Sequence, residues 1–166
     1  KFLVNDFRVR ESGSKTHVPT DFRNTGQVVG TYAESQRQRA ANSNYHSIQK
    51  KRSALPASHY REAVCNLLKE HQIVLISGET GCGKSTQVPQ FLLDDETIGP
   101  SCRMAITQPR RISAVAVAER IASERSETVG TTVGYSIRLD SEKSARTQVT
   151  FMTAGVLLRK VRFDPL

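Results

Sequence analysis

The chain has 166 residues, of which 37% are hydrophobic, and its formal net charge is +8 at pH 7. This length allows one ordinary domain with room for an extension. No apolar run approaches the roughly 18 residues of a membrane-spanning helix, and no signal peptide is visible, so we expect no membrane partner. Because the first residue is not Met, we also expect the natural N-terminus to lie upstream.

The positive charge is concentrated at the start of the chain. Residues 1–52 hold ten Lys or Arg against four Asp or Glu, a net +6, and residues 53–166 carry a net +2. The first region has little to bury and allows only a short strand near Phe2 and Val4 and a short helix within residues 31–41, so we expect a basic, poorly structured N-terminal extension or linker. Such a basic extension suggests a polyanionic partner, nucleic acid rather than a membrane. A solvated basic tail without a partner explains the charge equally well.

The globular part is predicted to span residues 53–166. Ser58 is the expected N-cap of a first helix that ends near residues 69–71, with an apolar stripe at helical spacing. Residues 73–77 are mostly β-branched or Leu and predict a short, fully buried strand. A helix is predicted over residues 86–93, where Val88, Phe91 and Leu92 share one face.

A glycine-rich loop joins that strand to that helix. Its sequence, Gly78-Glu79-Thr80-Gly81-Cys82-Gly83-Lys84-Ser85, matches the phosphate-binding pattern G-x-x-x-x-G-K-[ST] in full. The strand before and the helix after make a chance glycine-rich turn the weaker interpretation.

The residue types of this loop suit a nucleoside triphosphate. Glycines let successive backbone N–H groups face one anion, and the positive end of the helix that follows favours phosphate as well. Lys84 is expected to meet the β- and γ-phosphates, and the Ser85 hydroxyl is a candidate Mg²⁺ ligand. We therefore predict nucleotide binding by all nine residues from Gly78 to Thr86.

The rest of the chain alternates strands and helices. Strands are predicted at residues 103–107, 130–137 and 149–152, and helices at residues 112–121 and from about Val156, with a polar turn over residues 140–146. This alternation indicates an α/β fold, a parallel sheet with helices on both faces. Ligands bind beyond the carboxyl ends of the strands in such sheets, and polar or basic residues follow several of these strands.

The three cysteines, Cys65, Cys82 and Cys102, are scattered and odd in number. They lack the spacing of a zinc site or a disulfide framework. Cys82 inside the loop would be vulnerable to oxidation, so we expect a reducing intracellular setting, in the nucleus or the cytoplasm.

A second cluster narrows the kind of nucleotide-binding protein. Thr107-Gln108-Pro109-Arg110-Arg111 precedes ISAVAVAER, and VGYSIRLDS (133–141) and FMTAGVLLRK (151–160) follow in order. Together with GETGCGKST, these motifs make residues 55–166 resemble the DEAH/RHA family of superfamily-two RNA helicases. The resemblance implies a RecA-like P-loop NTPase lobe and ATP as cofactor, with other nucleoside triphosphates tolerated.

The resemblance also implies roles for single residues. Arg120, in the family's A-x-R position, would lie flat against the adenine. Arg110 and Arg111 would grip a nucleic-acid backbone, Arg138 would contact RNA from a turn, and Thr153 would hold a phosphate. Without the resemblance, each arginine could be a solvated surface charge and Thr153 an N-cap. The implied partners are single-stranded or structured RNA, with DNA and a helicase-activating protein as further candidates.

Two departures from the family pattern limit what the chain alone should do. Ala154 stands where many members have Asp, and the sequence stops at Leu166, before the acidic DEAH-type segment and the second lobe. We therefore expect an ATP-dependent RNA helicase, of which these 166 residues alone hydrolyse ATP poorly. The alternative is a non-hydrolysing, nucleotide-dependent RNA-binding or scaffold protein, which the intact Lys84 and Ser85 disfavour.

Overall fold

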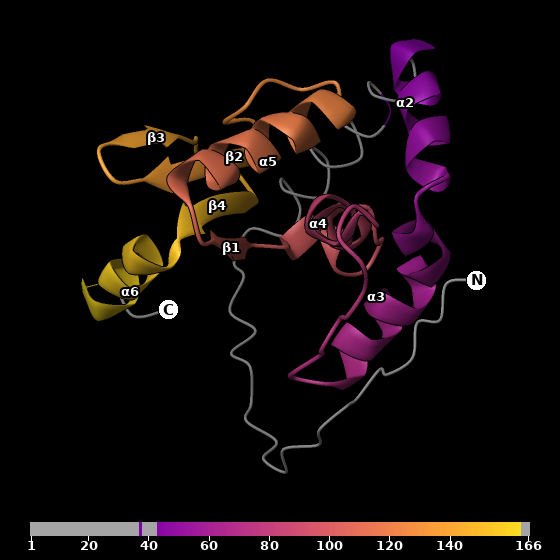
Figure 1. Cartoon of the computed structure of the whole chain (residues 1–166), viewed down its shortest axis with the longest axis horizontal. Coiled ribbons are helices and arrows are strands. Elements are labelled where there is room, and N and C mark those ends of the chain that lie inside the picture. The colour runs from indigo at the N-terminus through magenta and orange to yellow at the C-terminus, as the bar shows by residue number, and fades with distance from the viewer. Residues whose placement is uncertain (1–36, 38–42, 164–166) are drawn as a thin grey trace.

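The computed structural model describes residue 37 and residues 43–163 (Figure 1). The short strand predicted near Phe2 and Val4, and the helix predicted within residues 31–41 except for residue 37, lie outside these residues. In chain order the elements are α2 (Ser43–Ser53), η1 (Pro56–Tyr60), α3 (Arg61–Glu70), α4 (Lys84–Leu93), η2 (Gly99–Ser101), β1 (Met104–Gln108), α5 (Arg111–Glu124), β2 (Val133–Ile137), β3 (Asp140–Glu142), β4 (Val149–Thr153) and α6 (Ala154–Phe163).

The sheet has four strands in the order β1-β4-β2-β3. β1 and β2 both pair with β4 in parallel, with Gln108 opposite Thr153 and Ser136 opposite Met152. β3 pairs with β2 in antiparallel fashion. Residues 140–146 were predicted as a turn, but the first three of them form this short edge strand. The predicted α/β fold is thus confirmed, with a mixed and mostly parallel sheet.

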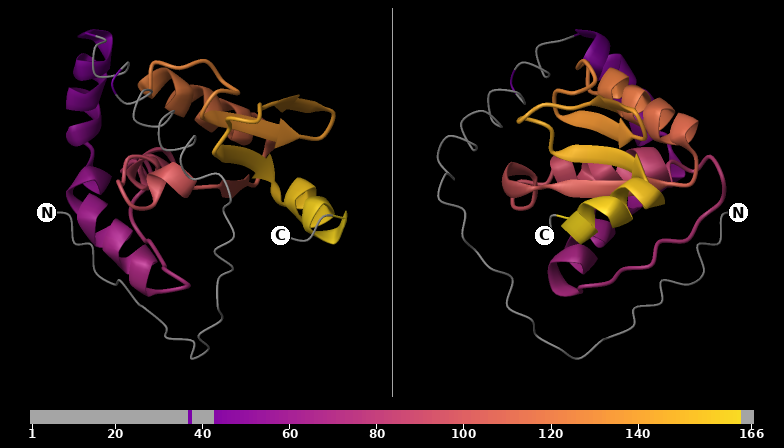
Figure 2. Two further views of the ribbon diagram at one scale, coloured as in Figure 1. Left: turned by 180° about the vertical axis from the view of Figure 1, so that it is seen from behind. Right: turned by 90° about the vertical axis from the view of Figure 1, so that its left-hand side faces the viewer.

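The core lies between the sheet and α5, which runs along one face of the sheet (Figure 2). Ala114, Ala118 and Ile121 of α5 are fully buried against strand residues that include Val149 and Phe151. Small side chains on α5 let the helix approach the strands closely, and each large apolar side chain contributes roughly 1.5–3 kcal/mol by its burial. On the opposite face, Ala105 and Thr107 of β1 are exposed.

The strand predicted at residues 73–77 is absent from the sheet, and this prediction was wrong. Ile73 and Leu75 are 63% and 60% exposed, where a fully buried strand was expected. A strand exists only where a neighbour satisfies its backbone groups, and β propensity is largely a property of that environment. Among the described residues, none pairs with this segment.

The helix boundaries differ from the predicted ones by a few residues. Ser58 lies inside η1, where its hydroxyl donates a hydrogen bond to the Arg52 carbonyl (2.5 Å), so it is not an N-cap. Tyr60 precedes α3 instead, without a side-chain cap. α4 begins two residues earlier than predicted, α5 extends three residues further, and α6 follows Thr153 directly.

α2 lies beside the globular part, within the region predicted as an extension. Its residue Arg52 is only 6% exposed, and its Nε donates a hydrogen bond to Gln87 of α4 (2.8 Å). The division of the chain at residues 52 and 53 stays a prediction, but the last residue of the predicted extension packs against the lobe. Among the described residues, no helix is long and apolar enough to cross a bilayer.

Candidate nucleotide-binding site and nucleic-acid edge

The glycine-rich loop has a backbone that requires glycine at two positions. Gly81 and Gly83 have φ angles of +85° and +100°, in the left-handed region that side chains disfavour. Gly83 is the N-cap of α4, so the helix begins at Lys84. η1 contacts the loop, since the Ala57 N–H donates a hydrogen bond to the Cys82 carbonyl (3.1 Å).

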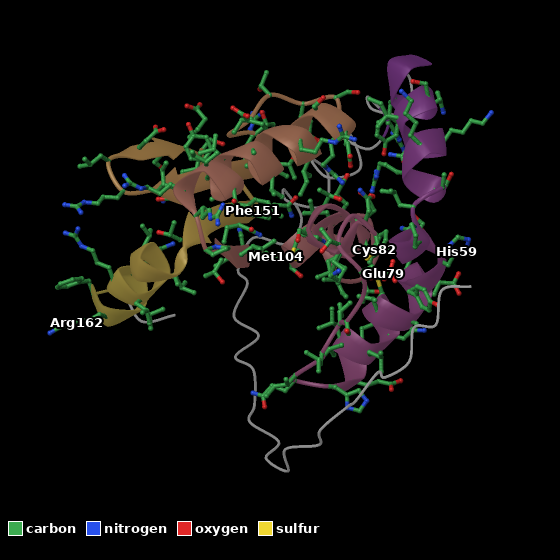
Figure 3. All side chains as sticks on the ribbon, viewed as in Figure 1. His59, Glu79, Cys82, Met104, Phe151 and Arg162 are labelled. Carbon is green, nitrogen blue, oxygen red and sulfur yellow. The ribbon has the colours of Figure 1, made fainter. Side chains whose placement is uncertain are left out.

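Lys84 reaches back across the loop that precedes it. Its Nζ donates hydrogen bonds to the carbonyls of Gly78 and Glu79, the latter at 2.7 Å, and lies 3.5 Å from the Cys82 sulfur. Figure 3 shows Glu79 and Cys82 together beside α3 and α4. The ammonium group is therefore held at the centre of the loop by its backbone carbonyls.

The outer side of the loop is open. Residues 77–81 are exposed, and a Cβ at Gly81 would meet no atom within 4 Å. Ser85 is exposed in the first turn of α4. A single hydroxyl fits Mg²⁺, which usually keeps several waters and takes its other ligands from phosphates. The loop thus has the space, charge and donor set for a Mg²⁺-bound triphosphate.

Arg120 lies near the C-terminal end of α5, the end that adjoins α4. Its side chain is 67% exposed, and its Nε donates to Oε1 of Glu124 (2.7 Å). Glu124 Oε2 accepts hydrogen bonds from Gln87 (3.0 Å) and Gln90 (2.8 Å), both of α4. The structure therefore ties Arg120 to the helix that begins with Lys84.

The pKa of Glu124 reflects this arrangement. Burial alone would raise the pKa of the carboxyl group, but the hydrogen bonds from Gln87, Arg120 and Gln90, with the charge of Arg120, outweigh it. The pKa of Glu124 is therefore below its ordinary value, and the carboxylate is ionised at neutral pH.

The four predicted nucleic-acid contacts lie at one edge of the sheet. Arg110 caps α5 just after β1, Arg111 begins α5, Arg138 follows β2, and Thr153 ends β4. The carboxyl ends of the three parallel strands meet at this edge because Gln108 lies opposite Thr153. The three arginines are exposed and Thr153 is half-buried.

The two groups of predicted site residues are separated along α5. Arg120 follows Arg111 by about two and a half turns, which is about 14 Å at 1.5 Å per residue. An open groove of about 470 Å³ runs beside the first half of the helix. It is lined by Arg111, Ile112, Val115, Ala116, Glu119 and Ile137.

Sequence reasoning missed the polar cluster behind the loop, which comprises Arg52, Gln87, Gln90 and Glu124. Its partners lie 34 to 37 residues apart, and no local pattern reveals such pairs. Two signals were present, however. Arg120 and Glu124 have the i, i+4 spacing of a helical ion pair, and Gln87 and Gln90 are two amides one turn apart beside apolar neighbours.

Similarity to known proteins gives the family of the chain. No protein-family model matches it. The human protein named "Putative ATP-dependent RNA helicase DHX57" is 52% identical over 138 residues, 81% of this chain and 10% of that protein. DExH-box ATP-dependent RNA helicase DExH1 of Arabidopsis thaliana is 50% identical over 117 residues, 69% of this chain and 12% of its own length.

Both relatives are thus matched across most of this chain, although the chain spans only about a tenth of either. Their names agree with the resemblance carried by the glycine-rich loop and the three later motifs. The chain belongs to the DExH/DEAH-box family of ATP-dependent RNA helicases.

Proposed function

We propose that the whole protein is an ATP-dependent RNA helicase and that this chain supplies most of the triphosphate site of its first lobe. The observation that carries the proposal is the loop itself, with Lys84 held at its centre and α4 beginning directly behind it. Oriented backbone N–H groups, a lysine charge and a helix N-terminus together favour a triphosphate.

The proposed cofactors are ATP and Mg²⁺, with Ser85 as the protein's ligand to the metal. Arg120 would stack on the base, and because stacking reads no base edge, other nucleoside triphosphates should also bind. Hydrolysis at this site would depend on positioning of the phosphates and stabilisation of their charge.

The proposed substrate is RNA, held by its backbone through Arg110, Arg111, Arg138 and Thr153. Such contacts position a strand without reading its bases, so DNA is a second candidate ligand. We also propose a nuclear or cytoplasmic location and a helicase-activating protein partner. The relatives named as RNA helicases support RNA as the ligand, and the half-buried Cys82 thiol in the loop supports the reducing location.

Lys84→Ala tests the nucleotide site. Binding of a fluorescent ATP analogue to the 166-residue chain, and ATP hydrolysis by the whole protein, should both be abolished, because the change removes the charge that is placed to meet the β- and γ-phosphates. Lys160→Ala, which changes an exposed lysine of α6, is the matched control and should leave both unchanged.

Normal turnover by a folded Lys84→Ala protein would overturn the assignment of the loop. ATP binding without RNA-stimulated hydrolysis by the whole wild-type protein would instead support the non-hydrolysing RNA-binding alternative.

A further inference from the structure

A buried polar cluster joins α2, α4 and α5 directly behind the glycine-rich loop. Arg52 and Glu124 are 6% and 5% exposed, and Gln87 and Gln90 are completely buried. Burying a charged group is costly unless it is paired and hydrogen-bonded. Glu124 is paired in this way, whereas Arg52 Nη1 and Gln90 Oε1 are buried without a hydrogen-bond partner in the part of the chain that the structure describes.

The two oxygens of Glu124 have different partners. Oε1 accepts from Arg120, whereas Oε2 accepts from the amides of Gln87 and Gln90. The Arg52 Nε lies 3.8 Å from Oε2 and donates to the Gln87 oxygen, which orients the Gln87 amide toward the carboxylate. One side of Glu124 therefore faces the loop helix and the other faces Arg120.

This division fixes the position of Arg120 relative to the triphosphate. Gln87 lies one turn after Lys84 in the same helix and donates a hydrogen bond to Glu124. The position of Glu124 is therefore set relative to the first turn of α4. Arg120 is otherwise largely exposed, and a free arginine side chain has many accessible rotamers. The hydrogen bond to Glu124 removes part of that freedom before a ligand binds.

We propose that Glu124 is a positioning residue for the nucleobase: it holds the Arg120 guanidinium at a set distance from Lys84, so that base and triphosphate are bound together. The inference rests on the proposed function of the loop and of Arg120. In this proposal Glu124 affects only the part of the ATP affinity that comes from the base. It acts through Arg120 and does not itself contact the nucleotide.

The experiment compares ATP with inorganic tripolyphosphate, a ligand that has the phosphates and no base. In Glu124→Gln, one carboxylate oxygen becomes an NH₂ group, which cannot accept from Arg120 or from the two amides. We expect ATP to bind the whole chain roughly two- to fivefold more weakly, the range of a single exposed cation–π contact. Tripolyphosphate binding should change by less than that.

Arg120→Ala should produce the same selective weakening, and the double variant should bind ATP no more weakly than either single variant, because the two residues act as one unit. Glu119→Gln is the matched control: it removes the adjacent acidic charge, which is exposed and lies outside the cluster. This control should bind both ligands as the wild type does.

Three results would overturn the inference. Unchanged ATP affinity in a folded Glu124→Gln chain would mean that Arg120 needs no positioning. Equal weakening for ATP and tripolyphosphate, if repeated in Glu124→Asp, which keeps the charge and retracts the carboxylate, would mean that Glu124 serves only the loop. If the wild-type chain binds neither ligand, the proposed nucleotide site itself fails, and the inference with it.

Discussion

At the scale of single residues, the three cysteines differ in what surrounds them. Cys82 is half-buried in the glycine-rich loop beside Lys84, and Cys65 and Cys102 are buried. Burial raises the pKa of Cys65, and it raises the pKa of Cys102 to about 11. Because the thiolate is the reactive form, the two buried thiols should react slowly.

We predict that iodoacetamide at mildly alkaline pH modifies Cys82 first, as measured by mass spectrometry of peptides. Mg²⁺ with ATP should slow this reaction, since a bound triphosphate would cover the loop. A Cys82→Ser chain should show little labelling under the same conditions. Labelling of Cys102 before Cys82, or no protection by nucleotide at a saturating concentration, would contradict the proposed place of the ligand.

Residues whose role depends on their immediate neighbours were predictable from the sequence. The left-handed backbone at Gly81 and Gly83 needs glycine, and the pattern around Lys84 is local, so the loop could be identified before its structure was known. Arg52 and Glu124 could not be identified in this way. Their burial arises from the packing of three helices, and an arginine or glutamate in a sequence most often indicates a surface.

At the scale of elements, the buried side chain of Arg52 contributes to the contact between α2 and the lobe. Arg52 contacts Gln87 at 2.8 Å and lies 3.7 Å from Asp94. Arg52→Ala should lower the free energy of unfolding by roughly 3–5 kcal/mol, because it leaves buried acidic groups without one of their cations. Urea denaturation followed by circular dichroism measures this change.

Lys51→Ala is the control for α2, since it changes the exposed neighbouring lysine and should cost less than about 0.5 kcal/mol. Equal stability of the Arg52→Ala and Lys51→Ala chains would contradict the docking of α2. It would support the sequence-based prediction that all of residues 1–52 form an extension outside the lobe.

Elements were predictable where one segment contains its own signal. The helix predicted at residues 112–121 and the strand predicted at residues 103–107 have the correct type and nearly correct bounds, as α5 and β1 show. Residues 73–77 also have a local signal for a strand, a run of β-branched residues and Leu, yet they form none, because strand formation also requires a pairing partner. The short antiparallel strand β3 was missed because its residues, Asp-Ser-Glu, are typical of a turn.

At the scale of the whole molecule, α5 connects two regions with different proposed ligands. Its first residue lies at the carboxyl edge of the sheet with Arg110, Arg138 and Thr153, and its last turn contacts the helix of the phosphate loop. A helix with one face packed against the sheet, between two proposed binding regions, is a physical route for coupling nucleotide binding to RNA binding.

A salt titration tests whether the arginines at the carboxyl edge of the sheet bind RNA. Changing both Arg110 and Arg138 to Ala should weaken binding of single-stranded RNA about equally for two unrelated sequences, because phosphate contacts carry no base information. The slope of log K against log salt should also flatten, by roughly 0.7 for each phosphate that is no longer neutralised. Fluorescence anisotropy with labelled RNA, in the whole protein, measures both quantities.

Arg146→Ala is the control, since Arg146 is an exposed arginine in the turn before β4, at the opposite edge of the sheet. It should leave the salt slope unchanged, which separates a backbone contact from a general effect of net charge. Weaker binding confined to one RNA would indicate that these arginines read bases. An unchanged slope in the double variant would mean that Arg110 and Arg138 do not touch the RNA backbone, and that strand binding belongs to another surface of the protein.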